Sequence, residues 1–224
     1  MKLHLGCGKT YLDGYVNIDY PATEHAVEAD VHADLYADIR KLSYPPSSIE
    51  EIRLHHVFEH FTRPVALALL CRWRDFLQPG GLLRIETPDA EANFKAMLSP
   101  FLGFVRKQPI LRHLYGSHEA HWAVHCDAWY KKKFLVTLTA LGFHHLKFTK
   151  QKYGHLHNIQ VYAYKSERSL WPEDYFAISK NLLDMSTIRV HVNLPENLDS
   201  ESSMLKVWLE IWKEIYDGEQ GASG

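Results

Sequence analysis

The sequence predicts an α/β fold in which a mostly parallel sheet is flanked by helices. Short apolar strands alternate along the chain with longer segments of helical periodicity. The first predicted strand, 2–5, ends at Gly6 and Gly8, and the second, 15–18, ends at Asp19. A glycine pair after a strand lets the chain turn sharply and lets a ligand approach main-chain N–H groups. These residues therefore predict a ligand site at the end of the first strand as well as the fold class.

The connection between the first two predicted strands is short. Residues 9–14 leave room for a loop but not for a crossover helix, which with its turns needs a dozen or more residues. The acidic stretch 20–38 leads to a third strand that ends near Asp38. Thr62 and Asp127 are the expected N-caps of later helices, and residues 99–126 are expected to be irregular with short helices. The other expected elements are strands at 51–57, 82–87, 143–150 and 158–165 and helices at 62–77, 90–98 and 127–141.

The pattern changes after residue 165, which predicts a domain at 1–165 and a C-terminal extension at 166–224. The extension contains a predicted helix at 174–185, an alternating strand at 187–194, and a helix at 202–216. The last of these carries an apolar stripe too broad for a helix that lies alone on water. It either packs on its own chain or joins two copies. We expect a homodimer, because the domain is complete without an extra layer.

Composition limits the possible functions. The chain has 224 residues, 46% hydrophobic and 23% charged, which is ordinary for a globular protein. A net charge of −2 gives no electrostatic reason to bind nucleic acid. The odd cysteine count, with no CxxC pair, argues against a disulfide framework. Because the N-terminus enters a strand at once, we expect no signal peptide. No apolar run reaches 18 residues, so we expect no membrane span either, and hence a cytoplasmic protein.

Five segments together resemble a known family. LHLGCG followed by NID is similar to motif I and the strand-two acid of class I S-adenosyl-L-methionine (SAM)-dependent methyltransferases. The likeness is closest to the small type 11 methyltransferases, some of which are linked to sugar or polysaccharide modification. It implies a Rossmann-like class I methyltransferase sheet, to which the C-terminal strand-and-helix extension is added, and SAM as the cofactor. The likeness covers about residues 2–165 and continues, in the family's order, through 37–42, 55–61, 76–89 and 138–143.

The resemblance also implies which residues hold the cofactor. It places the methionine moiety over Gly6, Cys7 and Gly8, and the ribose hydroxyls on Asp19. Tyr20 would cover the adenine face. Cys7 is expected to fill space rather than act as a nucleophile, because nothing nearby in the sequence would lower its pKa. A dinucleotide site is disfavoured, since the third glycine of GxGxxG is missing and the acid follows too soon.

Further cofactor contacts are implied after the third and fourth strands. Asp38 matches the family's acid that meets the adenine amino group, and Ile39 would donate its main-chain N–H. Either His55 or His56 faces the cofactor, depending on the strand register. The family position favours His56.

Histidines supply the candidate catalytic groups. His60 is the expected general base and His125 the second choice, because imidazole suits proton transfer near neutral pH. If their segment is helical, His118, His121 and His125 share one face and could bind a metal together with His60. We expect no metal, because methyl transfer does not need one and Glu119 is the sole carboxylate at ligand spacing. A substrate-facing lid is the expected role of this segment.

The predicted function is transfer of the SAM methyl group to a small polar acceptor, above all a hydroxyl of a sugar, a nucleotide sugar or a related metabolite. The basic run 131–133 is expected to be a solvated helix face, with contact to an anionic substrate as the alternative. Two other functions stay open at this point. One is a protein or RNA methyltransferase, and the other is a SAM- or nucleotide-binding module without turnover in a larger assembly. Neither nucleic acid nor membrane is an expected partner.

Overall fold

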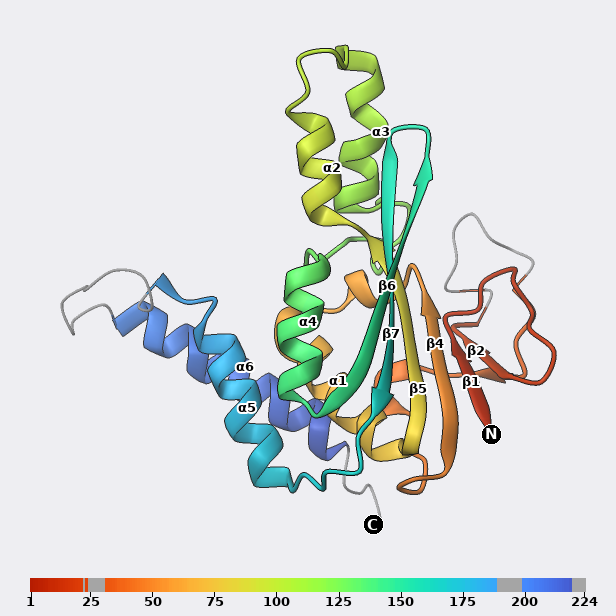
Figure 1. The fold of residues 1–224 in the computed structure, drawn as a ribbon, viewed down its shortest axis with the longest axis vertical. Helices are drawn as coiled ribbons and strands as arrows, with labels where there is room; N and C mark the ends of the chain where they lie inside the picture. Colours follow the sequence, from red (N-terminus) through yellow and green to blue (C-terminus); the bar gives the residue numbers. More distant parts are fainter. Residues whose placement is uncertain (22, 24–30, 189–198, 219–224) are drawn as a thin grey trace.

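The computed structural model describes residues 1–21, 23, 31–188 and 199–218. In this part of the chain, seven strands form one mixed sheet in the order β3-β2-β1-β4-β5-β7-β6 (Figure 1). β7 runs antiparallel to both of its neighbours, and the other paired strands are parallel. The predicted Rossmann-like sheet flanked by helices is therefore confirmed. The strands are β1 (Lys2–Leu5), β2 (Val16–Asp19), β3 (Leu35–Tyr36), β4 (Ile49–His55), β5 (Leu77–Pro88), β6 (Phe143–Tyr153) and β7 (Leu156–Lys165).

The sheet has two chemically different faces, because polar and apolar residues alternate along its central strands. In β4, Ile52 and Leu54 are fully buried, whereas Arg53 between them lies on the opposite face. Arg53 pairs in register with Arg84 of β5, whose guanidinium lies 5.2 Å from the ring centroid of Tyr162 on β7. The apolar face packs against helices and forms the core. The polar side chains therefore gather on the other face.

The first two connections of the sheet help to explain this polar face. The described residues between β1 and β2 and between β2 and β3 contain no α-helix, as expected for the first connection. Helices α1 and α4 cover the apolar face instead, and α5 and α6 lie on the same side of the sheet (Figure 1). The helices are α1 (Arg63–Phe76), α2 (Ala90–Met97), α3 (Phe104–Tyr115), α4 (Lys131–Ala140), α5 (Pro172–Asp184) and α6 (Asp199–Asp217), with the 3-10 turns η2 (Ile39–Lys41) and η3 (Phe58–His60).

The predicted start of the helix at 127–141 was wrong. Asp127 does not cap a helix, because α4 begins at Lys131 with Tyr130 at its N-cap. The Asp127 carboxylate instead lies 2.6 Å from Nζ of Lys133 and 3.6 Å from Nε of Arg63. The histidine-rich stretch is not helical either, since α3 ends at Tyr115 and residues 116–130 contain no helix. Its histidines therefore do not share a helix face.

Helix α6 packs against α1 of its own chain. Its residues Leu205 and Trp212 are 8% and 2% exposed, and both belong to the same core as the sheet. The part of the expected apolar stripe that contains Leu205 and Trp212 is thus covered without a second chain. Oligomeric state stays a prediction. The expected strand at 187–194 and the tail after residue 218 lie almost wholly outside the described residues.

A buried polar contact also joins the extension to α1. Asp75 of α1 accepts hydrogen bonds from the hydroxyls of Tyr175 in α5, at 2.6 Å, and of Tyr216 in α6, at 3.3 Å. Arg74 donates to the same Tyr175 hydroxyl at 2.9 Å. These directional contacts fix how α5 and α6 dock, so the segments on either side of residue 165 share one core. Within the described ranges, no helix combines the length and apolar composition that crossing a membrane requires.

Candidate functional site

A cavity of about 830 Å³ opens at the carboxyl ends of β1 and β4, the central strands of the sheet. After β1 the chain continues to β2 on one side, and after β4 it continues to β5 on the other side. Ligands in open α/β sheets bind at such a point, where the strand order reverses. One side is lined by the loop after β1, the end of β2 and η2, and the other by the end of β4, η3 and segment 112–126. Among the predicted site residues, Gly6, Cys7, Gly8, Asp19, Tyr20, Ile39, His56, His60 and His125 line it, whereas Asp38 does not.

The turn after β1 needs glycine at its first position. Gly6 has a φ of +66°, and its N–H donates to the carbonyl of Ile18 at 2.8 Å. A Cβ placed on Gly6 would lie 2.2 Å from Cγ2 of Val57, the residue that follows the two histidines after β4. The absence of a side chain therefore lets the β1 loop approach the end of β4. Gly8, with a φ of +53°, completes the turn.

Asp19 ends β2 and holds this loop in place. Its Oδ2 accepts a hydrogen bond from the Gly8 N–H at 2.6 Å, and its Oδ1 accepts one from the Tyr20 N–H at 2.7 Å. The residue is 7% exposed and lines the cavity. Each carboxylate oxygen has capacity for a further hydrogen bond. Asp19 can therefore orient the glycine loop and still accept from a bound diol.

Cys7 fills space between these residues. It is 4% exposed, and its Sγ lies 3.6 Å from the carbonyl oxygen of His32. Burial, together with the nearby Asp19 carboxylate, raises the pKa of the Cys7 thiol to about 12. A thiol with this pKa is not a nucleophile at neutral pH. The expectation that Cys7 has no nucleophilic role agrees with this environment.

At η2 the charged side chain that lines the cavity is Arg40, whereas the sequence suggested Asp38. Asp38 points to Arg40, accepting from its Nε at 3.0 Å and from a terminal nitrogen at 2.6 Å. Burial alone would raise the pKa of Asp38, but the Arg40 guanidinium outweighs it and the pKa is lowered. Arg40 lines the cavity together with Tyr20 and Ile39. Ile39 is the first residue of η2, so its N–H has no partner within that turn. A contact of Asp38 with adenine stays a prediction.

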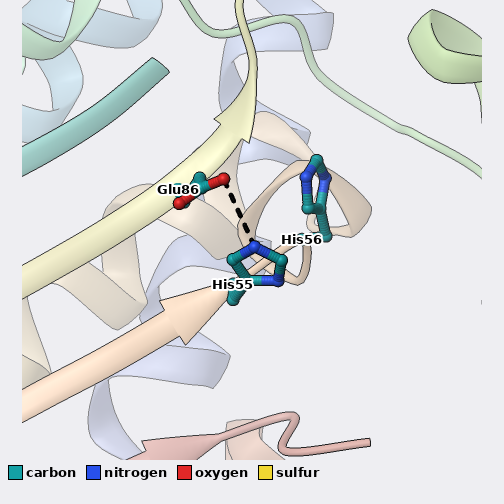
Figure 2. Close-up of side chains that lie close together, drawn as sticks. All are labelled: His55, His56 and Glu86. Carbon is teal, nitrogen blue, oxygen red and sulfur yellow. Dashed lines mark ion pairs between the residues drawn. The ribbon is translucent and has the colours of Figure 1, made fainter. Parts of the chain in front are cut away.

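His55 and Glu86 form a pair across the ends of two neighbouring strands. They are partners in the register of β4 and β5, and Nε2 of His55 lies 3.3 Å from Oε1 of Glu86 (Figure 2). The His55 side chain is 48% exposed and lines the cavity, whereas Glu86 is 2% exposed. Nδ1 of His55 has no hydrogen bond to another described residue. One ring nitrogen is thus held by a buried carboxylate while the other is accessible.

His56 belongs to a second network and is held on both sides. Its Nδ1 lies 3.0 Å from Oε1 of Glu59, and its Nε2 accepts from the side-chain amide of Asn158 at 2.9 Å. The Asn158 amide also donates to Glu86 at 3.2 Å, and its Oδ1 lies 2.7 Å from Nε2 of His113. With a φ of +54°, His56 bends the chain out of β4. Both His55 and His56 therefore line the cavity, and which of them faces the cofactor stays a prediction.

His60 and His125 meet at the far side of the cavity. Their ring centroids are 4.7 Å apart with an interplanar angle of 85°. Nδ1 of His60 lies 3.1 Å from the carbonyl oxygen of Val124, and Nε2 of His125 lies 3.9 Å from Oε1 of Glu59. The loop that carries His125 is tied down by the Cys126 N–H, which donates to the Glu59 carbonyl at 2.8 Å. The two histidines predicted to be catalytic are thus brought together, around a buried carboxylate.

Sequence reasoning missed several residues of this site. Glu86 and Asn158 carry the network beneath the histidines, and Arg53 and Arg112 line the cavity. Glu86 could have been predicted from the sequence, because it lies at the end of a predicted strand next to β4. Asn158 could not, because it reaches the site through the register of an antiparallel strand pair, which the sequence does not specify. Lys131–Lys133 do not line the cavity, and Lys133 pairs with Asp127.

Comparison with known proteins adds little beyond the fold. No protein-family profile matches the chain, and no curated protein is significantly similar to it in sequence. Among solved structures it is similar to a SAM-dependent methyltransferase from Methanosarcina mazei, with 15% identity, a TM-score of 0.48, and 75% of this chain and 92% of that one aligned. It is also similar to the 1,6-didemethyltoxoflavin-N1-methyltransferase of Burkholderia thailandensis, with 14% identity, a TM-score of 0.48, and 74% and 71% aligned. A SAM-dependent methyltransferase from Archaeoglobus fulgidus gives 12% identity, a TM-score of 0.49, and 73% and 85% aligned.

Proposed function

We propose that the protein transfers the methyl group of SAM to a hydroxyl of a small polar acceptor. The observation that carries this proposal is the meeting of the Gly6–Gly8 turn with Asp19 in one cavity at the centre of the sheet. A carboxylate accepts from both hydroxyls of a ribose, and the turn offers main-chain groups to the amino-acid part of the cofactor. The sequence resemblance to class I methyltransferases supports the same cofactor.

The proposed reaction is an in-line displacement. The acceptor oxygen attacks the methyl carbon, the electrons of the breaking C–S bond stay on sulfur, and S-adenosylhomocysteine is released. The hydroxyl proton passes to a base in the cavity. The protein contributes by holding the oxygen and the methyl carbon at a near-attack distance of about 3–3.5 Å.

His55 is the base that we propose for this step. It lines the cavity, one of its ring nitrogens is accessible, and Glu86 holds the other. A buried carboxylate in this position fixes the imidazole tautomer and stabilises the imidazolium that forms. The sequence favoured His60, and then His125, for proton removal. We propose that His60 and His125 instead position the acceptor hydroxyl from the other side of the cavity.

The charged side chains that line the cavity favour an acceptor of a particular chemical class. The cavity lining contains the cationic side chains of Lys9, Arg53 and Arg112, besides Arg40, which is paired with Asp38. Nε of Arg53 is buried without a hydrogen-bond partner among the described residues. An acceptor with phosphate or carboxylate groups, such as a nucleotide sugar, would pair with these cations. We therefore propose a sugar or nucleotide sugar as the acceptor class.

We expect the protein to bind SAM and S-adenosylhomocysteine but not NAD. The acid that follows the glycine turn is placed for one ribose, and the third glycine of a dinucleotide loop is missing. Isothermal titration calorimetry of the full chain with each of the three ligands tests this. Binding of NAD alone, or of none of the three, would overturn the proposed cofactor. SAM binding without turnover on any nucleotide sugar would instead favour a binding module or a macromolecular acceptor.

Single substitutions of the cavity histidines test the base. We expect His55→Asn to lower kcat by at least about 10²-fold with SAM binding intact, because general-base catalysis contributes about 10²–10⁴-fold. Glu86→Gln, which keeps the shape but removes the charge, should give a smaller loss in the same direction. A screen of sugars and nucleotide sugars identifies an acceptor, and turnover of each variant with that acceptor decides this. If His55→Asn keeps wild-type kcat while His60→Ala loses it, the base is His60, as the sequence suggested.

A further inference from the structure

Three side chains at the acceptor side of the cavity have the spacing of a metal site. The ligand atoms of Glu59, His60 and His125, here called the Glu59 group, all lie within 4.8 Å of one another. Ligands held at about 2.0–2.2 Å from one tetrahedral ion are about 3.4 Å apart, so movements of about 1 Å would bring these atoms into place. We propose that the Glu59 group binds one divalent transition-metal ion such as Zn²⁺.

The Glu59 carboxylate is the strongest indication. Its side chain is 2% exposed, and its Oε1 is shared between Nδ1 of His56, at 3.0 Å, and Nε2 of His125, at 3.9 Å. Its Oε2 is buried and has no hydrogen bond to any described residue. Leaving one oxygen of a buried carboxylate unpaired is costly, and such atoms are rare in folded proteins. A cation bound at this oxygen would remove the cost.

His60 is oriented as a metal ligand usually is. Its Nδ1 lies 3.1 Å from the carbonyl oxygen of Val124. Histidines that bind metals typically donate their second N–H to a backbone carbonyl or a carboxylate in this way, which fixes the ring and leaves its other nitrogen for the ion. His125 presents its Nε2 to the same carboxylate, 3.9 Å from Oε1 of Glu59.

The main chain holds the group together although its members lie far apart in the sequence. The carbonyl of Glu59 accepts from the N–H of Cys126 at 2.8 Å and from that of Asp127 at 3.3 Å. The loop with His125 is therefore anchored directly to the turn with Glu59 and His60. The sequence argued against a metal because the histidines of the loop lacked a suitable carboxylate. The fold supplies that carboxylate from η3.

The donor atoms decide which kind of ion fits. Two imidazole nitrogens and one carboxylate oxygen suit Zn²⁺, Fe²⁺ or Co²⁺, whereas Mg²⁺ and Ca²⁺ prefer oxygen ligands throughout. Three protein ligands leave coordination positions open, as in catalytic zinc sites. Because His60 and His125 line the cavity, these positions face it. On the proposed function, an acceptor oxygen would occupy one of them, and His55 would remain to take the proton.

A second set of side chains, His55, His56 and Glu86, also has ligand spacing (Figure 2). It fits an ion less well, because both ring nitrogens of His56 are already engaged, one by Glu59 and the other by Asn158. The oxygens of Glu86 are likewise engaged, by the amides of Asn158 and Gln160. No such saturation exists at Oε2 of Glu59.

Metal titration of the full chain tests the site independently of activity. The protein is treated with chelator, dialysed, and titrated by calorimetry with Zn²⁺, and separately with Co²⁺, whose visible absorption reports the coordination number. We expect one ion per chain and a four- or five-coordinate Co²⁺ spectrum. Glu59→Gln, which keeps the side-chain volume, and His125→Ala should each weaken Zn²⁺ binding by at least about 10²-fold. The matched control is His121→Ala, a cavity histidine outside the group, which should change the affinity by less than about threefold.

Three results would overturn the site. The first is that the wild type does not bind Zn²⁺ stoichiometrically. The second is that His121→Ala weakens Zn²⁺ binding as much as the group variants do, and the third is that His55→Ala or Glu86→Gln weakens it while Glu59→Gln does not. Circular dichroism of each variant shows whether it is folded, and if Glu59→Gln is not, His125→Ala carries the test. SAM binding is measured separately on the metal-free protein. Zn²⁺ binding without SAM binding would leave the site standing while the proposed function fails, and SAM binding without Zn²⁺ binding would do the reverse.

Discussion

Asp19→Ala is expected to raise the Kd for SAM by about 10²- to 10⁴-fold. The carboxylate would accept two hydrogen bonds from the ribose hydroxyls, and a hydrogen bond to a charged group contributes about 1.5–3 kcal/mol. The substitution also frees the N–H groups of Gly8 and Tyr20, which Asp19 now holds at 2.6 and 2.7 Å. The glycine turn would thus lose its orientation as well as its partner. Calorimetric titration with SAM and with S-adenosylhomocysteine measures the effect.

A matched control separates the ribose contact from a general change of charge. Asp13 lies in the same β1–β2 connection, is exposed, and does not line the cavity. Asp13→Ala should therefore leave the Kd within about twofold of the wild type. Thermal unfolding of both variants shows whether the loss in Asp19→Ala is accompanied by loss of the fold. An unchanged Kd in a folded Asp19→Ala variant would contradict the cofactor site.

Trp212→Ala is expected to lower the free energy of unfolding by about 3–5 kcal/mol. Trp212 is 2% exposed, stacks on Tyr216 with ring centroids 4.7 Å apart, and meets the ring of Phe176 edge-on at 5.7 Å. Removing its indole would leave a cavity between α6, α5 and α1. For a chain of this length we expect the melting temperature to fall by about 6–20 °C. Urea unfolding monitored by far-ultraviolet circular dichroism measures the difference in the free energy of unfolding.

The exposed tryptophan next to α5 is the control. Trp171 is 69% exposed, and Trp171→Ala should change the free energy of unfolding by less than about 0.5 kcal/mol. Light scattering of the same samples addresses the homodimer that the sequence suggested. If Trp212→Ala unfolds like the wild type but a wild-type dimer falls apart, α6 acts at an interface rather than in the core of its own chain.

The sequence determined the elements whose signal is local. The strand that ends at Gly6, the strand that ends at Asp19 and the strand pair after Phe143 were all found within a few residues of their observed bounds, as was helix α1. Glycine turns, strand alternation and helical periodicity depend on neighbours in the chain, so a linear reading detects them. The same reading grouped Gly6, Gly8 and Asp19, which meet in the cavity, because these residues lie within one short stretch. Their contact with a cofactor stays a prediction.

Only the tertiary structure decided the acceptor side. Glu59, His125, Asn158 and Glu86 meet there from η3, a loop without regular structure, β7 and β5. A loop carries no periodicity, so the sequence left open whether the histidines of segment 118–125 share one helix face, and the structure shows that they do not. The contact of Glu59 with His125 depends on main-chain hydrogen bonds between residues more than sixty positions apart. The position of α6 was likewise open, since an apolar stripe requires burial but does not specify the surface that buries it.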